Sequence, residues 1–109
     1  MSEALLVLTN CPDDAVADRI ALALVEQGLA ACVNRLAPVG SIYRWQGKVE
    51  RATEVPLLIK TTRERYGSVE QAIRHLHPYD LPEIIALPIA AGHAAYLRWI
   101  ESATQPPVA

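Results

Sequence analysis

The chain has 109 residues, of which 51% are hydrophobic and 20% charged, and its formal net charge is −2. This length predicts one globular domain over residues 1–109 with a single core, and the net charge gives no basic field that would attract nucleic acid. No apolar run is long enough to cross a bilayer, Met-Ser-Glu does not begin a signal peptide, and two cysteines make no disulfide framework, so we expect a cytoplasmic protein with reduced thiols.

The first part of the chain predicts a strand followed by a helix. Residues 4–9 (ALLVLT) are almost all apolar, which is typical of a strand that is buried on both faces. Pro12 and two aspartates then open a helix, because acidic side chains favour the positive end of the helix dipole. Its apolar residues recur at i, i+4 and i+8 through Glu26, and Gly28 suits the position just after its end.

Residues 30–61 predict one long β-hairpin. Two extended runs, 30–45 and 48–61, are joined by Gln46-Gly47, and glycine at the second loop position favours a tight primed turn. An arm of about thirteen residues spans roughly 43 Å, whereas a globule of this length has a diameter of about 34 Å. The tip would therefore expose aromatic side chains and open strand edges unless another chain covers it, so the sequence predicts an oligomer. Bends or bulges are expected at residues 38–40 and at Pro56.

A second helix is expected between residues 62 and 75, with two possible starts. Thr62 could cap it, or Ser68 and Gln71 could form a capping box one turn later. His77 precedes a proline and ends the helix, because the residue before proline is displaced from helical backbone angles.

The remaining elements complete the order β-α-β-β-α-β. Residues 83–90 predict a strand, and Gly92 starts a third helix whose inward residues are expected to be Tyr96, Leu97 and Ile100. This order predicts an α+β fold, the ferredoxin-like split β-α-β sandwich with an extra C-terminal helix and strand order 4-1-3-2. Cys11 and Cys32 would then lie on non-adjacent strands, too far apart for a disulfide.

A specific combination of phrases is spread over the chain: CPD at 11–13, LAACVN at 29–34, SIYRWQGKVE at 41–50, LIKT at 58–61 and HPYDLPEIIALPI at 77–89. Together they resemble the CutA family, whose members are named for divalent-cation tolerance. The resemblance implies a ferredoxin-like homotrimer, similar in architecture to PII signalling proteins, in which the long hairpin pairs across subunits.

The resemblance also implies weak binding of copper(II) or another divalent cation. CutA proteins are described as binding copper through a cysteine at the end of the first strand and two histidines before Pro-Tyr. His77 matches the second histidine, whereas Leu76 stands at the first, and Cys11 lies two residues beyond the cysteine position, which Thr9 occupies. We therefore name His77 and Cys11 as candidate metal ligands. The alternative is that His77 only ends the helix and hydrogen-bonds the loop.

A second candidate site combines the hairpin with the loop after the second helix. A turn at Gln46-Gly47 sets Tyr43 opposite Glu50 and Trp45 opposite Lys48. Lys60 lies about 33 Å from Glu50 along the strand, so only neighbouring subunits could unite them. The functional interpretation is an intersubunit cleft for a small anion or metabolite, walled by the His77 loop and by Tyr43, Trp45, Glu50, Lys60, Tyr79, Asp80 and Glu83. Aromatic and polar packing within a trimer interface is the alternative that we favour.

These patterns lead to two hypotheses for function. The first is a trimeric cytoplasmic protein involved in tolerance of, or response to, divalent metal ions, with weak copper binding. The second is a PII-like signalling or adaptor trimer that binds a small molecule in the intersubunit cleft, although a glycine-rich phosphate loop is missing. An enzyme is not expected, because Ser41 and Ser68 lie in turn or cap contexts and no nucleophile has an evident base.

Overall fold

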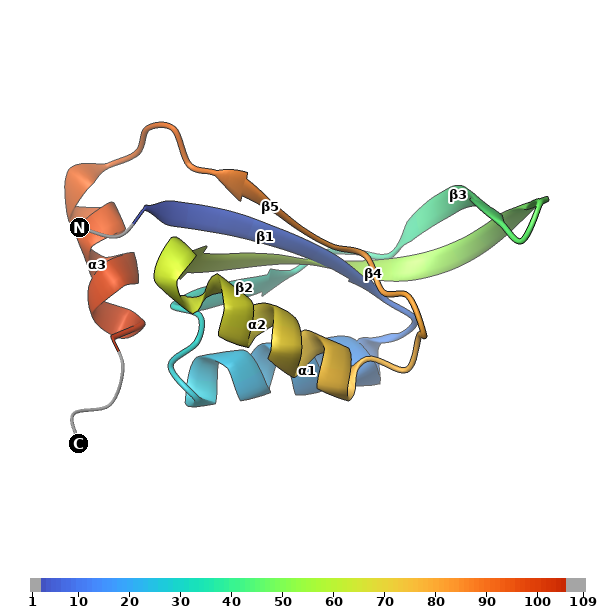
Figure 1. Ribbon diagram of the computed structural model, residues 1–109, viewed down its shortest axis with the longest axis horizontal. Helices are drawn as coiled ribbons and strands as arrows, with labels where there is room; N and C mark the ends of the chain where they lie inside the picture. Colours follow the sequence, from blue (N-terminus) through green and yellow to red (C-terminus); the bar gives the residue numbers. More distant parts are fainter. Residues whose placement is uncertain (1–2, 106–109) are drawn as a thin grey trace.

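The computed structural model describes residues 3–105 and arranges them as a long twisted sheet with two helices on one face and a third helix at one end (Figure 1). The elements in chain order are β1 (Ala4–Cys11), α1 (Asp14–Glu26), β2 (Cys32–Arg35), β3 (Val39–Trp45), β4 (Lys48–Thr62), α2 (Arg63–Leu76), β5 (Ile84–Pro88) and α3 (Ala94–Ala103). This order confirms the predicted α+β, ferredoxin-like fold.

The sheet has the order β2-β4-β1-β5, and β3 pairs with β4 outside this path. The second hairpin arm therefore lies between the first strand and the first arm, as the strand order 4-1-3-2 predicts. Cys11 lies opposite Val55, and Cys32 lies opposite Lys60, so five residues of β4, about 17 Å, separate the two cysteines along the sheet. Both thiols are free.

The β3–β4 ribbon projects from the body of the molecule, whose longest dimension is 45 Å (Figure 1). Its turn has a φ of 49° at Gln46 and 80° at Gly47, which are the two positive values that a type I′ turn requires. The predicted register is confirmed, because Tyr43 pairs with Glu50 and Trp45 pairs with Lys48.

A one-residue bulge separates β2 from β3. Arg35 pairs with Leu57 and Val39 pairs with Glu54, so residues 36–38 oppose only residues 55–56. The bulge therefore lies slightly before the predicted position. Pro56 causes no break in β4, because its carbonyl still accepts a 3.0 Å hydrogen bond from the amide of Leu36.

The helix boundaries follow local capping. Asp13 accepts a 2.9 Å hydrogen bond from the amide of Val16 and so begins α1, and Gly28 follows that helix with a φ of 68°. Thr62 precedes α2, so the earlier of the two predicted starts is correct and Ser68 lies inside the helix, but the side chain of Thr62 makes no capping hydrogen bond.

The core lies between the sheet and the helices α1 and α2. Alternate residues of β1 and β4 point towards these helices, and the fully buried side chains include Val7, Leu57, Ile59, Ile20, Leu24 and Ile73. In α3, Ile100 is buried as predicted, but Tyr96 is 42% exposed, so its predicted inward position is wrong for the single chain. A short helix at the end of the sheet buries only one narrow stripe of side chains.

The other face of the sheet has no helix over it (Figure 1). Leu8 lies between Leu58 and Ile85, and Leu6 is the neighbour of Leu87, so the alternation of the strands gathers apolar side chains there. Ile85 and Leu87 are 51% and 52% exposed.

Candidate functional site

The loop after α2 is held in place by His77. The Nε2 atom of its ring lies 2.7 Å from the carbonyl oxygen of Asn10, and its Nδ1 atom accepts a 3.2 Å hydrogen bond from the amide of Tyr79. Because Nδ1 accepts, the proton of the neutral ring lies on Nε2, which donates to Asn10. The ring is buried and packs against the ring of Tyr79 at a centroid distance of 4.6 Å.

The other predicted metal ligand, Cys11, is a core residue at the end of β1. Its side chain is fully buried. Burial, followed by the negative charges of Asp13 and Glu54, raises the pKa of the thiol from 9.0 to about 11. A metal ligand must be a thiolate, so the raised pKa makes it more costly for this sulfur to lose its proton on coordination.

In the folded single chain, coordination of copper by His77 and Cys11 would compete with contacts that these two side chains already make. Both ring nitrogens of His77 have partners within the fold, and the thiol of Cys11 is protonated and covered. Within residues 3–105, no three histidine, cysteine, aspartate or glutamate side chains gather into a group that could hold a metal ion. A metal ion at His77 would have to replace one of the hydrogen bonds that fasten the loop.

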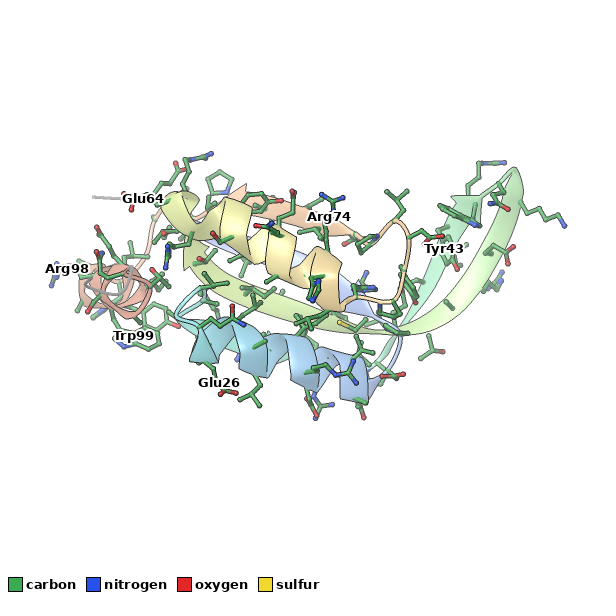
Figure 2. The ribbon with its side chains drawn as sticks, turned by 60° about the horizontal axis from the view of Figure 1, so that its bottom comes forward. Glu26, Tyr43, Glu64, Arg74, Arg98 and Trp99 are labelled. Atoms are coloured by element: carbon green, nitrogen blue, oxygen red, sulfur yellow. The ribbon has the colours of Figure 1, made fainter. Side chains whose placement is uncertain are left out.

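A hollow of about 350 Å³ lies where the ribbon meets this loop, and Figure 2 shows Tyr43 at that junction. Its walls come from β1, the two ribbon strands and the segment before β5, and they consist of Asn10, Tyr43, Trp45, Glu54, Tyr79, Asp80, Leu81 and Glu83. Five of the residues predicted for the cleft thus lie around one cavity of a single chain: Tyr43, Trp45, Tyr79, Asp80 and Glu83.

Two predicted cleft residues are not part of this hollow. Glu50 pairs with Tyr43 but does not line the cavity. Lys60 lies in the distant half of β4, where its Nζ atom donates to the side chain of Asn34 and is 3.8 Å from the sulfur of Cys32. The single chain therefore keeps Lys60 apart from the aromatic residues.

Sequence reasoning missed Asn10, Glu54 and Leu81 as lining residues. Glu54 had a usable signal, because strand alternation places it on the same ribbon face as Glu50. Asn10 and Leu81 had none, since their positions depend on how the end of β1 meets the loop before β5.

Glu54 is the most deeply placed charge of the hollow, with only 9% of its surface exposed. The hydroxyl of Tyr79 donates to its Oε2 atom over 3.4 Å, and burial together with the charge of Glu54 raises the pKa of Tyr79. Elsewhere in the lining, the side-chain amide of Asn10 donates to Glu83 over 3.5 Å. Both bonds are long, so these carboxylates keep acceptor capacity for a further partner.

None of the helices within residues 3–105 combines the length and the apolar character needed to cross a membrane.

Comparison with known proteins identifies relatives along almost the whole chain. Residues 5–103 match the family model described as CutA1 divalent ion tolerance protein. The divalent-cation tolerance protein CutA of Thermus thermophilus is 48% identical over 99 residues, which are 91% of this chain and 96% of that protein. The CutA homolog of Xenopus laevis is 48% identical over 91 residues, 84% of this chain, but this match spans only 60% of the Xenopus protein.

Solved structures agree with these relatives. The Thermus thermophilus CutA1 structure has a TM-score of 0.92 and 47% identity, and the match covers 94% of this chain and 99% of that chain. The CutA structure from Archaeoglobus fulgidus, described as periplasmic, has a TM-score of 0.91 and 36% identity over 94% of this chain and 99% of that one. By sequence and by fold, this chain belongs to the CutA1 divalent ion tolerance protein family.

Proposed function

We propose that this protein acts as a cytoplasmic homotrimer in the tolerance of divalent metal ions, without enzymatic activity. The observation that carries self-association is the uncovered apolar face of β1, β4 and β5, together with a ribbon that extends beyond the body of the molecule. The number of three subunits comes from the family resemblance. The role in metal tolerance rests on membership of the family. Fractionation of cells that produce the protein tests the compartment, and recovery outside the cytoplasm would contradict it.

The exposed apolar surface gives a physical reason for association. Ile85 and Leu87 on the open sheet face are each about half exposed, and Ile42 and Val49 on the ribbon are exposed by 63% and 65%. Covering the exposed half of a leucine or isoleucine side chain would contribute about 1 kcal/mol. Repeated over several residues in each of the copies, this contribution favours a permanent assembly.

Sedimentation equilibrium tests the assembly directly. We expect a species near three times the chain mass of 11.9 kDa, which is about 36 kDa. Leu87→Asp should shift the equilibrium towards smaller species, because it places a charge on the proposed interface. Leu22→Asp is the matched control, since Leu22 is 61% exposed on α1, on the other side of the sheet. A stable wild-type monomer of about 12 kDa at micromolar concentration would contradict the trimer.

Weak copper binding at His77 and Cys11 belongs to the same proposal. The hydrogen bonds of His77 to Asn10 and Tyr79 would oppose coordination, which accounts for low affinity. Titration with copper should raise the melting temperature, and His77→Ala should remove the increase, whereas His75→Ala, an exposed neighbour, should retain it. If copper changes the melting temperatures of the two variants equally, copper does not bind at His77.

The second candidate function is a PII-like signalling or adaptor trimer whose cleft binds a small molecule. The hollow of about 350 Å³ at the base of the ribbon supports it, because it has the size of a small-ligand pocket and combines aromatic walls with a few polar groups. Native mass spectrometry of the purified assembly tests this function. A non-metal ligand retained in stoichiometric amount would support it, and exclusive retention of metal ions would favour metal tolerance alone.

A further inference from the structure

The charged side chains that line the hollow at the base of the ribbon are all acidic. Among the residues that the structure describes, the lining contains the carboxylates of Glu54, Asp80 and Glu83 and no lysine, arginine or histidine. The ion pairs of residues 3–105 lie elsewhere and use Arg35 and Arg63. In the single chain, the charged lining residues would therefore repel a small anion, which the sequence alone had suggested.

Glu54 gives the strongest reason for a cationic occupant. Only 9% of this residue is exposed, yet the partner of its carboxylate within the described chain is one neutral hydroxyl, that of Tyr79, at 3.4 Å. A carboxylate removed from water loses much of its solvation, and a long hydrogen bond from a neutral donor restores little of it. A cation in the hollow would supply the missing charge.

The spacing of the carboxylates distinguishes an organic cation from a metal ion. They line one cavity, but no three acidic, histidine or cysteine side chains within residues 3–105 come close enough together to coordinate a single ion. Tyr43, Trp45 and Tyr79 occupy other parts of the wall. Aromatic faces attract ammonium groups through the ring quadrupole and cover the carbon atoms that join them.

We propose that this hollow binds a small organic amine that carries separated ammonium groups, a linear polyamine, with one ammonium group at Glu54. The proposal rests on the second proposed function, the small-molecule cleft, and names its ligand class. In this arrangement Glu54 pairs with the inner ammonium group, the rings of Tyr43 and Trp45 contact the chain, and Asp80 or Glu83 pairs with the outer group.

The fluorescence of Trp45 provides the test. The chain has two tryptophans, Trp45 in the lining and Trp99 on α3, so Trp99→Phe leaves one reporter (Figure 2). The intact Trp99→Phe protein is titrated with spermidine, with succinate and with magnesium chloride at constant ionic strength. We expect a saturable change with spermidine alone. A change with succinate alone would overturn the amine proposal and leave the small-molecule cleft intact. Silence with every probe would also overturn the amine proposal, and native mass spectrometry of the assembly then decides the small-molecule cleft.

Two further variants show where the amine binds. Glu54→Gln keeps the size of the side chain but removes its charge, and should weaken spermidine binding by about tenfold or more. Glu50→Gln is the matched control, because Glu50 lies on the same ribbon but outside the lining, and should change the affinity less than about twofold. Equal weakening by both variants, or an equal response to magnesium, would show general charge screening and would overturn the proposal. Sedimentation and melting of each variant confirm that it is folded.

Discussion

The Nε2 atom of His77 lies 2.7 Å from the carbonyl oxygen of Asn10, and this bond joins the end of α2 to the end of β1. The Nδ1 atom of the same ring accepts a hydrogen bond from the amide of Tyr79, which is the first residue of the loop to line the hollow. His77, which the sequence suggests as a metal ligand, therefore also positions one wall of the cavity through these two hydrogen bonds.

Replacing His77 should destabilise the fold more than replacing its exposed neighbour. His77→Ala removes two hydrogen bonds from a buried ring and leaves the carbonyl of Asn10 without this donor, so the free energy of unfolding should fall by roughly 2–3 kcal/mol. His75→Ala should change it by less than about 0.5 kcal/mol. Urea denaturation at fixed protein concentration measures both values, and equal values would show that the two bonds contribute nothing.

The hairpin turn should respond to substitutions that change its positive φ angles. Gly47→Ala should cost about 1 kcal/mol, because the φ of 80° is strained for a residue with a Cβ atom. Gln46→Asn should stabilise the turn by a few tenths of a kcal/mol, since asparagine tolerates the φ of 49° better.

Gly40→Ala is the control for the turn variants, because Gly40 lies in β3, has no positive φ, and leaves open space within 4 Å of where a Cβ atom would lie. Its melting temperature should stay close to that of the wild type. Thermal unfolding of the three variants distinguishes a strained turn from a general intolerance of side chains in the ribbon.

The buried hydroxyl of Thr61 should contribute measurably to stability. It donates a 2.6 Å hydrogen bond to the carbonyl of Leu29, which ties the loop after α1 to β4. Thr61→Val preserves the shape and removes the donor, so we expect a loss of about 1–2 kcal/mol. Thr62→Val is the matched control, since Thr62 is also buried but makes no capping bond with its side chain. Chemical denaturation should show the larger loss for Thr61.

The raised pKa of Cys11 should make the protein less stable in alkaline solution. The unfolded thiol loses its proton around pH 9.0, whereas the folded thiol keeps it until about pH 11. The folded state therefore binds more protons in this interval, and the free energy of unfolding falls as the pH rises, by at most about 2–3 kcal/mol. Denaturation between pH 8 and pH 11, with the free energy of unfolding measured at about four values per pH unit, should show this slope.

Cys11→Ala should flatten that alkaline slope, because the alanine chain has no buried proton to lose. Cys32→Ala controls for the removal of a thiol, since Cys32 is only partly buried. If both variants keep the wild-type slope, other groups cause the alkaline loss of stability.

Local features of this protein follow from its sequence alone. The turn at Gln46-Gly47, the ribbon register and the start of α1 at Asp13 each depend on residues a few positions apart. Backbone strain, strand alternation and capping act over these short distances, so a single sequence is sufficient to predict them. The strand order also follows, because few connections of these elements are sterically allowed.

The chemistry of the hollow depends on the tertiary structure. Asn10, Glu54 and Tyr79 are distant in sequence, and they meet only because β1 ends where β4 enters the ribbon and the loop after α2 folds back. These tertiary contacts bury Glu54 and give both ring nitrogens of His77 a hydrogen-bond partner. Solvation and hydrogen bonding depend on every neighbour in space, so residue identity and spacing could propose these side chains but could not assign their environment.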